Sequence, residues 1–236
     1  MKRYRAPNGE ERLWFEALEL EQIVEAELNK AGMMPSSTSP VVDVERFIEY
    51  HLKAALDQYA DLDETVLGVT EFFRGETPRI RVNKDLTGSA IDDGVSLPGL
   101  LGRWRATLAH EAGHVMLHRR LFDVAVGNLN LFGEADQPTP KQLPRCLKAL
   151  VSYSAVSEWR EVQANQAMAA LLMPRQLFVS LAREESGQTS SVDLIPLGAV
   201  DGVTKRLAER LQVSKQAARI RLATLGLVEP TQQLRF

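Results

Sequence analysis

The 236-residue sequence predicts an α+β fold that is mostly helical and contains one small antiparallel sheet. Two patterns predict it. Apolar side chains recur every three or four residues in several long segments, which is typical of amphipathic helices. Between residues 64 and 86 the pattern changes to alternating β-branched residues around a turn, which is typical of a hairpin. A hydrophobic content of 44 % suits one large domain or a core domain with a small appendage.

The N-terminal segment predicts one amphipathic helix from about Glu10 to Ala31. Gly32 then ends this helix. A linker of turn residues, "PSSTSP", separates it from "VVDVERFIEYHLKAAL", in which Asp43 can cap a second helix. We therefore expect residues 1–34 to form an N-terminal helical unit that precedes the main domain.

The middle of the chain predicts a hairpin followed by two longer helices. "TVLGVTEFF" and "RIRVN" read as antiparallel strands joined by the turn "RGETP". "LLGRWRATLAHEAGHVMLHRRLF" has no proline and reads as one long helix. Residues 123–145 hold three prolines and predict an irregular excursion. A further helix is expected over residues 153–172, where a Met-Pro pair ends it.

The long helix carries the segment "LAHEAGHVMLH", which holds three of the four histidines of the chain. His110 and His114 are four residues apart, so they project from the same helix face about one turn apart. Glu111 lies beside them. In this HExxH arrangement two imidazoles hold Zn²⁺, and the glutamate accepts a proton from a metal-bound water that attacks a carbonyl. The motif therefore indicates a zinc site that activates water.

A catalytic zinc needs a third protein ligand, and the sequence offers three candidates. His118 continues the row, but three ligands at successive helical turns would span about 12 Å, too far to surround one ion. The helix at 153–172 offers Glu158 and Glu161. Glu161 is preferred because Asn165, one turn later, can hydrogen-bond the far nitrogen of a ligating histidine and fix its tautomer.

Position 120 is an arginine, so the all-histidine ligand set of the metzincins is excluded and a gluzincin-like set is expected. The reaction also needs a donor that stabilises the developing oxyanion. Tyr153, Arg160 and His118 are plausible donors, and the sequence does not choose among them.

"TLAHEAGHVMLH" together with "EVQANQAMAALLMP" resembles the ImmA/IrrE family of metallopeptidases, over roughly residues 41–175. The resemblance implies a zincin-like catalytic domain there, with a zinc ion held by His110, His114 and Glu161 and with Glu111 as the catalytic base. It also implies a zinc endopeptidase that cleaves a helix-turn-helix transcriptional repressor. Such repressors often control stress-response or mobile-element genes, so a role in transcription regulation is expected.

The sequence departs from the family pattern at a few positions. Ala112 stands where leucine is usual, and Ala167 and Met168 stand where phenylalanine and alanine are usual. The segment at 123–157 is longer than expected. These differences concern packing and a loop, so they bear on the fit of the substrate more than on the chemistry.

Residues 200–236 predict a helix-turn-helix-like segment in which Ser214 caps the second helix. Within residues 203–228, six basic side chains and one acidic side chain give a local charge of +5, which could meet DNA phosphates. The basic residues are Lys205, Arg206, Arg210, Lys215, Arg219 and Arg221. The alternative is a helical appendage that packs on the catalytic domain and helps dock a protein partner.

Composition limits the remaining possibilities. A formal charge of −3 gives no general attraction to nucleic acid or membranes, and no apolar stretch has the length of a membrane span. A single cysteine, Cys146, and the absence of a signal peptide point to the cytoplasm. Two competing functions stay open: a DNA-binding regulatory protein with a structural or vestigial zinc site, and a hydrolase of small peptides or amides.

Overall fold

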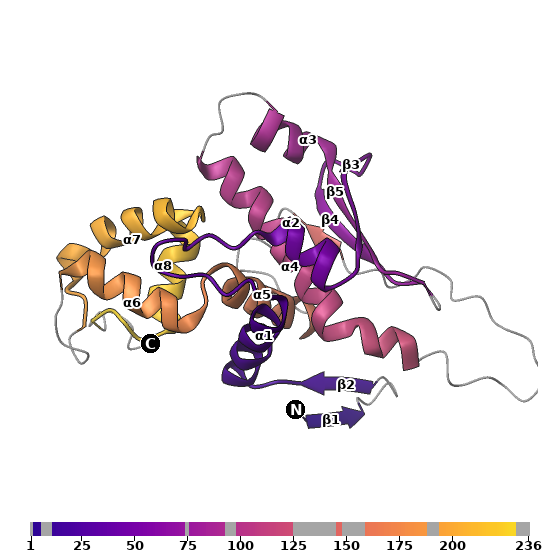
Figure 1. Ribbon diagram of the computed structural model, residues 1–236, viewed down its shortest axis with the longest axis horizontal. Helices are drawn as coiled ribbons and strands as arrows, with labels where there is room; N and C mark the ends of the chain where they lie inside the picture. Colours follow the sequence, from indigo (N-terminus) through magenta and orange to yellow (C-terminus); the bar gives the residue numbers. More distant parts are fainter. Residues whose placement is uncertain are drawn as a thin grey trace, which may run out of the picture.

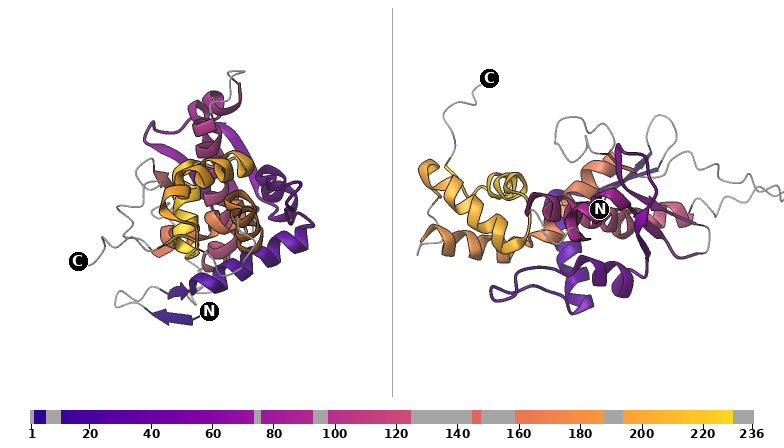
Figure 2. Two further views of the ribbon diagram at one scale, coloured as in Figure 1. Left: turned by 90° about the vertical axis from the view of Figure 1, so that its left-hand side faces the viewer. Right: turned by 90° about the horizontal axis from the view of Figure 1, so that it is seen from above.

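The computed structural model describes residues 2–5, 11–73, 76–92, 98–124, 145–147, 159–187 and 194–229. It has the expected α+β fold. The long helix α4 (Pro98–Val124) and the helix α5 (Trp159–Leu172) pack together at the centre. A sheet lies at one end of the molecule, and the three helices α6 (Arg175–Ser186), α7 (Leu197–Leu211) and α8 (Lys215–Thr224) gather at the other end (Figures 1 and 2).

The N-terminal helix begins later than the sequence pattern indicates. Strands β1 (Lys2–Arg5) and β2 (Glu11–Trp14) form an antiparallel pair, and α1 spans Ala17–Ala31. The predicted start near Glu10 is therefore wrong. The helix begins after Glu16, which forms a capping box with Glu19. In this box the Glu16 backbone N–H donates to the Glu19 carboxylate at 2.9 Å. The predicted end at Gly32 is confirmed, since this glycine adopts the left-handed conformation, with φ of 64°.

The second predicted helix is shorter than expected. Asp43 caps α2 (Val44–Arg46) as predicted, because its carboxylate accepts the Arg46 backbone N–H at 3.0 Å. A π-helical turn, η1 (Phe47–His51), follows, and the chain then enters β3 (Ala55–Ala60). Lys53, with φ of 54°, has a left-handed backbone that is incompatible with a continuing helix. The end of the expected helix is therefore a strand.

The larger sheet has the strand order β3-β5-β4-β6. Strands β4 (Val66–Glu71) and β5 (Arg79–Asn83) form the predicted antiparallel pair, but β3 runs parallel to β5, so the sheet is mixed. The predicted antiparallel pair is confirmed, and the parallel strand β3 is an addition that the sequence pattern did not predict. Strand β6 (Arg145–Leu147) pairs antiparallel with the other edge of β4. A short helix α3 (Lys84–Thr87) and a π-helical turn η2 (Gly88–Asp92) lead toward α4.

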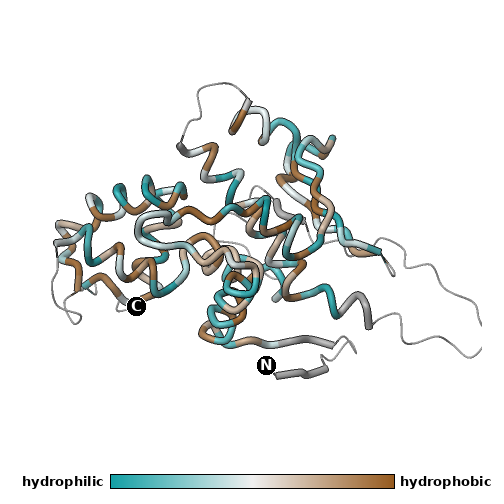
Figure 3. The backbone as a smooth tube through the Cα atoms, in the orientation of Figure 1, coloured by the Kyte–Doolittle hydropathy of each residue, from teal (hydrophilic) through white to brown (hydrophobic). Residues whose placement is uncertain are grey.

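One continuous hydrophobic core extends from Phe15 to Leu222, so α1 and the C-terminal helices share it with α4 and α5. Small residues line the contact between α4 and α5: Gly113 of α4 lies against Ala164 and Ala167 of α5, and both alanines are fully buried. Hydrophobic and hydrophilic residues alternate along α6 and α7, as expected for helices with one buried face (Figure 3). In the part of the chain that the structure describes, no helix combines the length and apolar character of a membrane span.

The C-terminal tail consists of two helices with a short turn, as predicted, and Ser214 caps α8 by accepting the Ala217 backbone N–H at 3.1 Å. Most of its basic side chains are paired within the chain. Arg206 and Arg210 bind Glu185, and Arg219 binds Asp201. The expected charge of +5 is therefore largely neutralised by acidic residues outside the window in which it was counted.

Arg221 joins the tail to the rest of the molecule. Its guanidinium is buried, binds both oxygens of Glu21 on α1, and donates to the Met173 carbonyl oxygen just after α5. The tail is thus packed on α1 and α5. This packing favours the expected alternative, a helical appendage on the main domain, over a free DNA-binding module.

Replacing Glu21 with alanine leaves the Arg221 guanidinium buried without its carboxylate. Because removing one partner of a buried ion pair costs about 3–5 kcal/mol, the free energy of unfolding should fall by about 3 kcal/mol. Lys30→Ala is the control, since it breaks an exposed pair with Glu27 and should cost less than about 1 kcal/mol. Chemical denaturation measures both variants, and equal losses would contradict this role of the pair.

Candidate metal centre

The site is built where α4 and α5 approach each other closely. His110 and His114 lie one turn apart on α4, and Glu161 lies in the first turn of α5. Gly113 permits the approach, because a Cβ atom there would lie 3.1 Å from the Ala164 carbonyl oxygen and 3.2 Å from the Ala167 Cβ. A larger residue at position 113 would push α5, and Glu161 with it, away from the histidines.

Three potential ligand atoms converge between the two helices. The His110 Nε2 lies 3.1 Å from the His114 Nε2 and 3.1 Å from Glu161 Oε2, and the His114 Nε2 lies 3.3 Å from Glu161 Oε1. Tetrahedral zinc with Zn–N distances of about 2.0–2.1 Å separates neighbouring ligand atoms by about 3.3 Å. The three side chains are at most 6 % exposed. They form a group that could hold a metal ion.

Asn165 fixes the tautomer of His110. Its side-chain oxygen lies 2.9 Å from the His110 Nδ1, so this ring nitrogen donates. When the ring is neutral, its Nε2 therefore presents a lone pair to Glu161 and His114. The predicted contact between Asn165 and a histidine of the motif is present in the structure.

A second chain of hydrogen bonds fixes the tautomer of His114. The His118 Nε2 donates to the Gln163 side-chain oxygen at 3.2 Å, so the neutral His118 ring presents its Nδ1 as an acceptor. The His114 Nδ1 lies 3.0 Å from that atom and donates to it. The His114 Nε2 therefore also presents a lone pair to the centre of the cluster.

These two hydrogen-bond chains test whether the cluster fits a metal ion. They aim two imidazole lone pairs and one carboxylate at the same buried point. Three acceptors without a cation between them would repel one another in a medium of low polarity. A divalent ion that takes nitrogen and oxygen ligands satisfies all three, and the surrounding hydrogen bonds are those that usually orient histidine ligands.

The electrostatics of the cluster agree with this geometry. Burial lowers the pKa of His114 to about 4, and burial together with the charge of His114 lowers the pKa of His118 to about 3. Both rings are therefore neutral near pH 7. Burial acts to lower the pKa of His110, but its hydrogen bond to Glu161 and the charge of Glu111 raise it above its usual value. Burial acts to raise the pKa of Glu161, but the two histidines hold it well below its usual range, as a carboxylate.

Glu111 is fully buried against strand β4. The Thr70 hydroxyl donates to Glu111 Oε2 at 2.5 Å. Gly68 leaves the room that the glutamate needs, since a Cβ atom at position 68 would lie 2.9 Å from Glu111 Oε1 and 2.8 Å from Thr107 Cγ2. The sheet therefore fixes the side chain that sits between the two histidines in sequence.

The structure narrows the candidate oxyanion donors. Both ring nitrogens of His118 are engaged, with His114 and Gln163, so this side chain has no free donor. Tyr153 and the rejected ligand Glu158 lie outside the described residues. Arg160 is buried and stacks over the Trp159 ring at 5.6 Å, and its charge acts on both His114 and His118. Arg160 is thus the one of the three candidate donors that is described and stays in consideration.

Sequence reasoning missed two residues of the site. Gln163 lies close to two other amides on α5, Asn165 and Gln166, so the sequence does not single it out, and only the structure shows that it is buried and bonded to His118. Thr70 is two residues from Gly68 on β4, so both residues lie on the strand face toward α4. The two-residue period of a strand is therefore a signal that could have identified Thr70 as a residue of the site. The partner that each one contacts lies more than 40 residues away in the chain.

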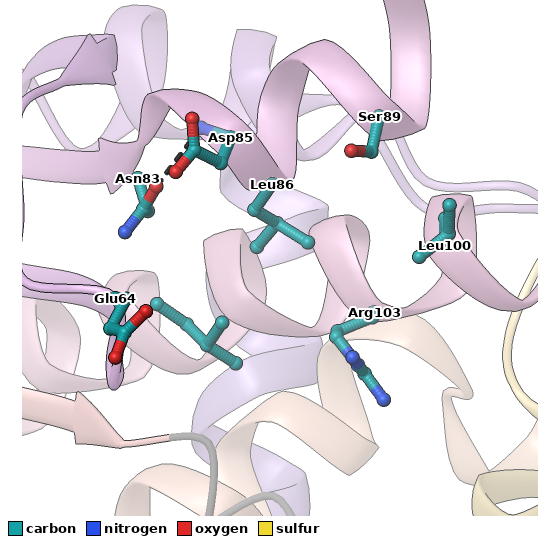
Figure 4. Close-up of a pocket in the computed structure, with 8 residues that line it drawn as sticks. Glu64, Asn83, Asp85, Leu86, Ser89, Leu100 and Arg103 are labelled. Carbon is teal, nitrogen blue, oxygen red and sulfur yellow. Dashed lines mark hydrogen bonds between the residues drawn. The ribbon is translucent and has the colours of Figure 1, made fainter.

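The cavities beside these helices include one next to the start of α4 and one next to α5, and the three potential ligands line neither of them. A cavity of about 200 Å³ lies beside the first turns of α4, between Asn83, Leu86 and Arg103 (Figure 4). A larger cavity of about 740 Å³ lies among α1, α5 and α8 and is bounded in part by Asn165. Since Asn165 binds His110 Nδ1, this cavity lies on the side of that ring away from the cluster.

Replacing Gln163 with alanine should weaken metal binding by about 10–100-fold, because the His118 and His114 tautomers are then no longer fixed. Asn165→Ala should act similarly through His110. Gln166→Ala is the matched control, since Gln166 lies on the same helix beside the 740 Å³ cavity. Competition with a chelator gives the affinities, and a similar loss in the control would contradict the tautomer argument.

Comparison with known proteins supports the family expected from the sequence. Residues 153–223 match the family Peptidase_M78, described as the IrrE N-terminal-like domain. This range includes Glu161 and Asn165 but not the motif on α4, and it continues through α8. The expectation that the resemblance ends before the C-terminal tail is therefore wrong. A search of curated proteins gave no significant match.

Proposed function

We propose that this chain, which matches a peptidase family over α5 to α8, is a zinc-dependent endopeptidase that cleaves a specific protein partner. The family match supports a hydrolase acting on peptide bonds. The observation that carries the proposal is the convergence of His110, His114 and Glu161 next to a buried glutamate.

In this proposal His110, His114 and Glu161 hold the metal ion and Glu111 is the catalytic base. Zinc is the metal that two imidazoles and one carboxylate typically bind in hydrolytic sites. When bound, it would supply a Lewis acid that acidifies water and polarises a peptide carbonyl. Asn165, Gln163 and His118 keep the two histidines in the tautomers that binding requires.

Glu111 would take the proton from the attacking water and pass it to the leaving amine nitrogen as the peptide bond breaks. Its hydrogen bond with Thr70 holds the Oε2 atom of this carboxylate on the sheet. Arg160, whose positive charge acts on His114, is our candidate for stabilising the negative charge that develops on the carbonyl oxygen.

We further propose that the substrate is a helix-turn-helix transcriptional repressor, as the family resemblance implies. The burial of the site supports a narrow choice of substrate, because His114 and Glu111 are fully buried. The paired arginines of the tail favour a packed helical unit over the alternative of a DNA-binding regulator.

Glu111→Gln should keep the fold and the metal but lose proteolysis by about 10²-fold or more, since an amide binds water but takes no proton from it. The cleavage rate, metal content and thermal unfolding of the variant are compared with those of the unmodified protein. A rate loss below about tenfold would argue against Glu111 as the base.

The zinc-loaded protein should make one cut in a helix-turn-helix repressor, in an exposed linker or helix end, and should digest casein poorly. Sequencing the fragments after incubation with the repressor encoded beside its gene measures this. Digestion of unrelated unfolded proteins at similar rates would contradict a single-partner protease.

A further inference from the structure

Strand β4 is the part of the sheet that touches Glu111. Thr70 binds the carboxylate, and the Gly68 backbone lies against the same side chain. One edge of β4 is paired with β5 in four consecutive positions, from Gly68 to Glu71. The opposite edge is therefore the place where another extended segment could lie beside the proposed catalytic base.

The chain itself occupies that edge. Strand β6 pairs antiparallel with β4, so that Cys146 lies opposite Gly68 and Arg145 lies opposite Val69. Strand β6 also contacts α4, the helix that carries the HExxH motif. The backbone of β6 therefore runs beside the β4 residue that lies against Glu111.

An added strand is a common way for a protein to bind an extended peptide, because backbone hydrogen bonds supply affinity whatever the peptide sequence. An endopeptidase must place a stretch of its substrate in extended form beside its base. We propose that the β4 edge at residues 66–69 is the docking edge for such a stretch, and that β6 is an internal competitor that must leave before the substrate binds. This inference rests on the proposed function.

The pairing of β6 is suited to exchange. This strand has three residues, and its register with β4 shifts between Val66 and Gly68. The pairing of β4 with β5 has no such shift. A short strand at a sheet edge opens at low free-energy cost compared with a central strand. A protein substrate with a longer extended segment would form more backbone hydrogen bonds and displace it.

The test uses the double variant Cys146→Pro/Leu147→Pro. Successive N–H groups of a strand point to opposite edges, so one of the two prolines removes a donor aimed at β4. Lys148→Pro/Ala149→Pro is the matched control, because it places the same residues outside β6. All proteins also carry Glu111→Gln, so that binding is measured without cleavage, and thermal unfolding and zinc content verify that each is folded.

Two readouts follow. The β4 amides that face β6 should exchange their hydrogens at least about tenfold faster in the double variant than in the control, whereas those that face β5 should not change. A free peptide of residues 143–149 should bind the double variant about tenfold tighter than the control and restore the slow exchange. Unchanged exchange at β4, or equal peptide binding by both proteins, would overturn the proposal.

Cleavage of the repressor is then measured with Glu111 restored. The double variant should cut it about tenfold faster than the control, because the internal competitor is gone. If the control cuts the repressor and the double variant is no faster, β6 is not a competitor. If neither protein cuts any protein, the proposed function fails, and the exchange and peptide measurements still decide whether β4 is a docking edge.

Discussion

The structure depends on one electrostatic constraint: two imidazole lone pairs and one carboxylate are aimed at the same buried point. Such an arrangement is stable only with a positive charge among the three groups. Hydrogen bonds from Asn165 and from the Gln163–His118 chain remove the alternative tautomers that would relieve the repulsion. That positive charge is supplied by a proton on His110, whose pKa is raised, or by a metal ion, which the three groups could hold in its place.

Other parts of the fold maintain this point. Gly113 and Ala164 let α4 and α5 approach closely enough for Glu161 to reach both histidines. Arg221 of α8 binds the Met173 carbonyl oxygen at the end of α5 and Glu21 on α1, so the tail restrains the helix that carries Glu161. The family match covers α5 to α8, so it includes both α5 and the tail that packs on it.

Local patterns predicted the parts of the site that lie on one helix face. The spacing of His110 and His114, and of Glu161 and Asn165, follows from helical period alone. Contacts between distant segments had no such signal: Thr70 meets Glu111 across 41 residues, and Gln163 meets His118 across 45. The parallel strand β3 was missed because a capped helical start at Asp43 hid the left-handed turn at Lys53. The positive charge counted in the tail suggested a DNA-binding surface, but the acidic residues that pair with it lie elsewhere in the chain.

The ligand set is the central claim, and metal analysis of three zinc-loaded proteins tests it most directly. The unmodified chain and Glu158→Ala should each retain one zinc ion after dialysis against a weak chelator, whereas Glu161→Ala should lose it, because two histidines alone leave the site incomplete. Thermal unfolding without metal checks that each variant is folded. Retention of zinc by Glu161→Ala together with its loss from Glu158→Ala would contradict the account.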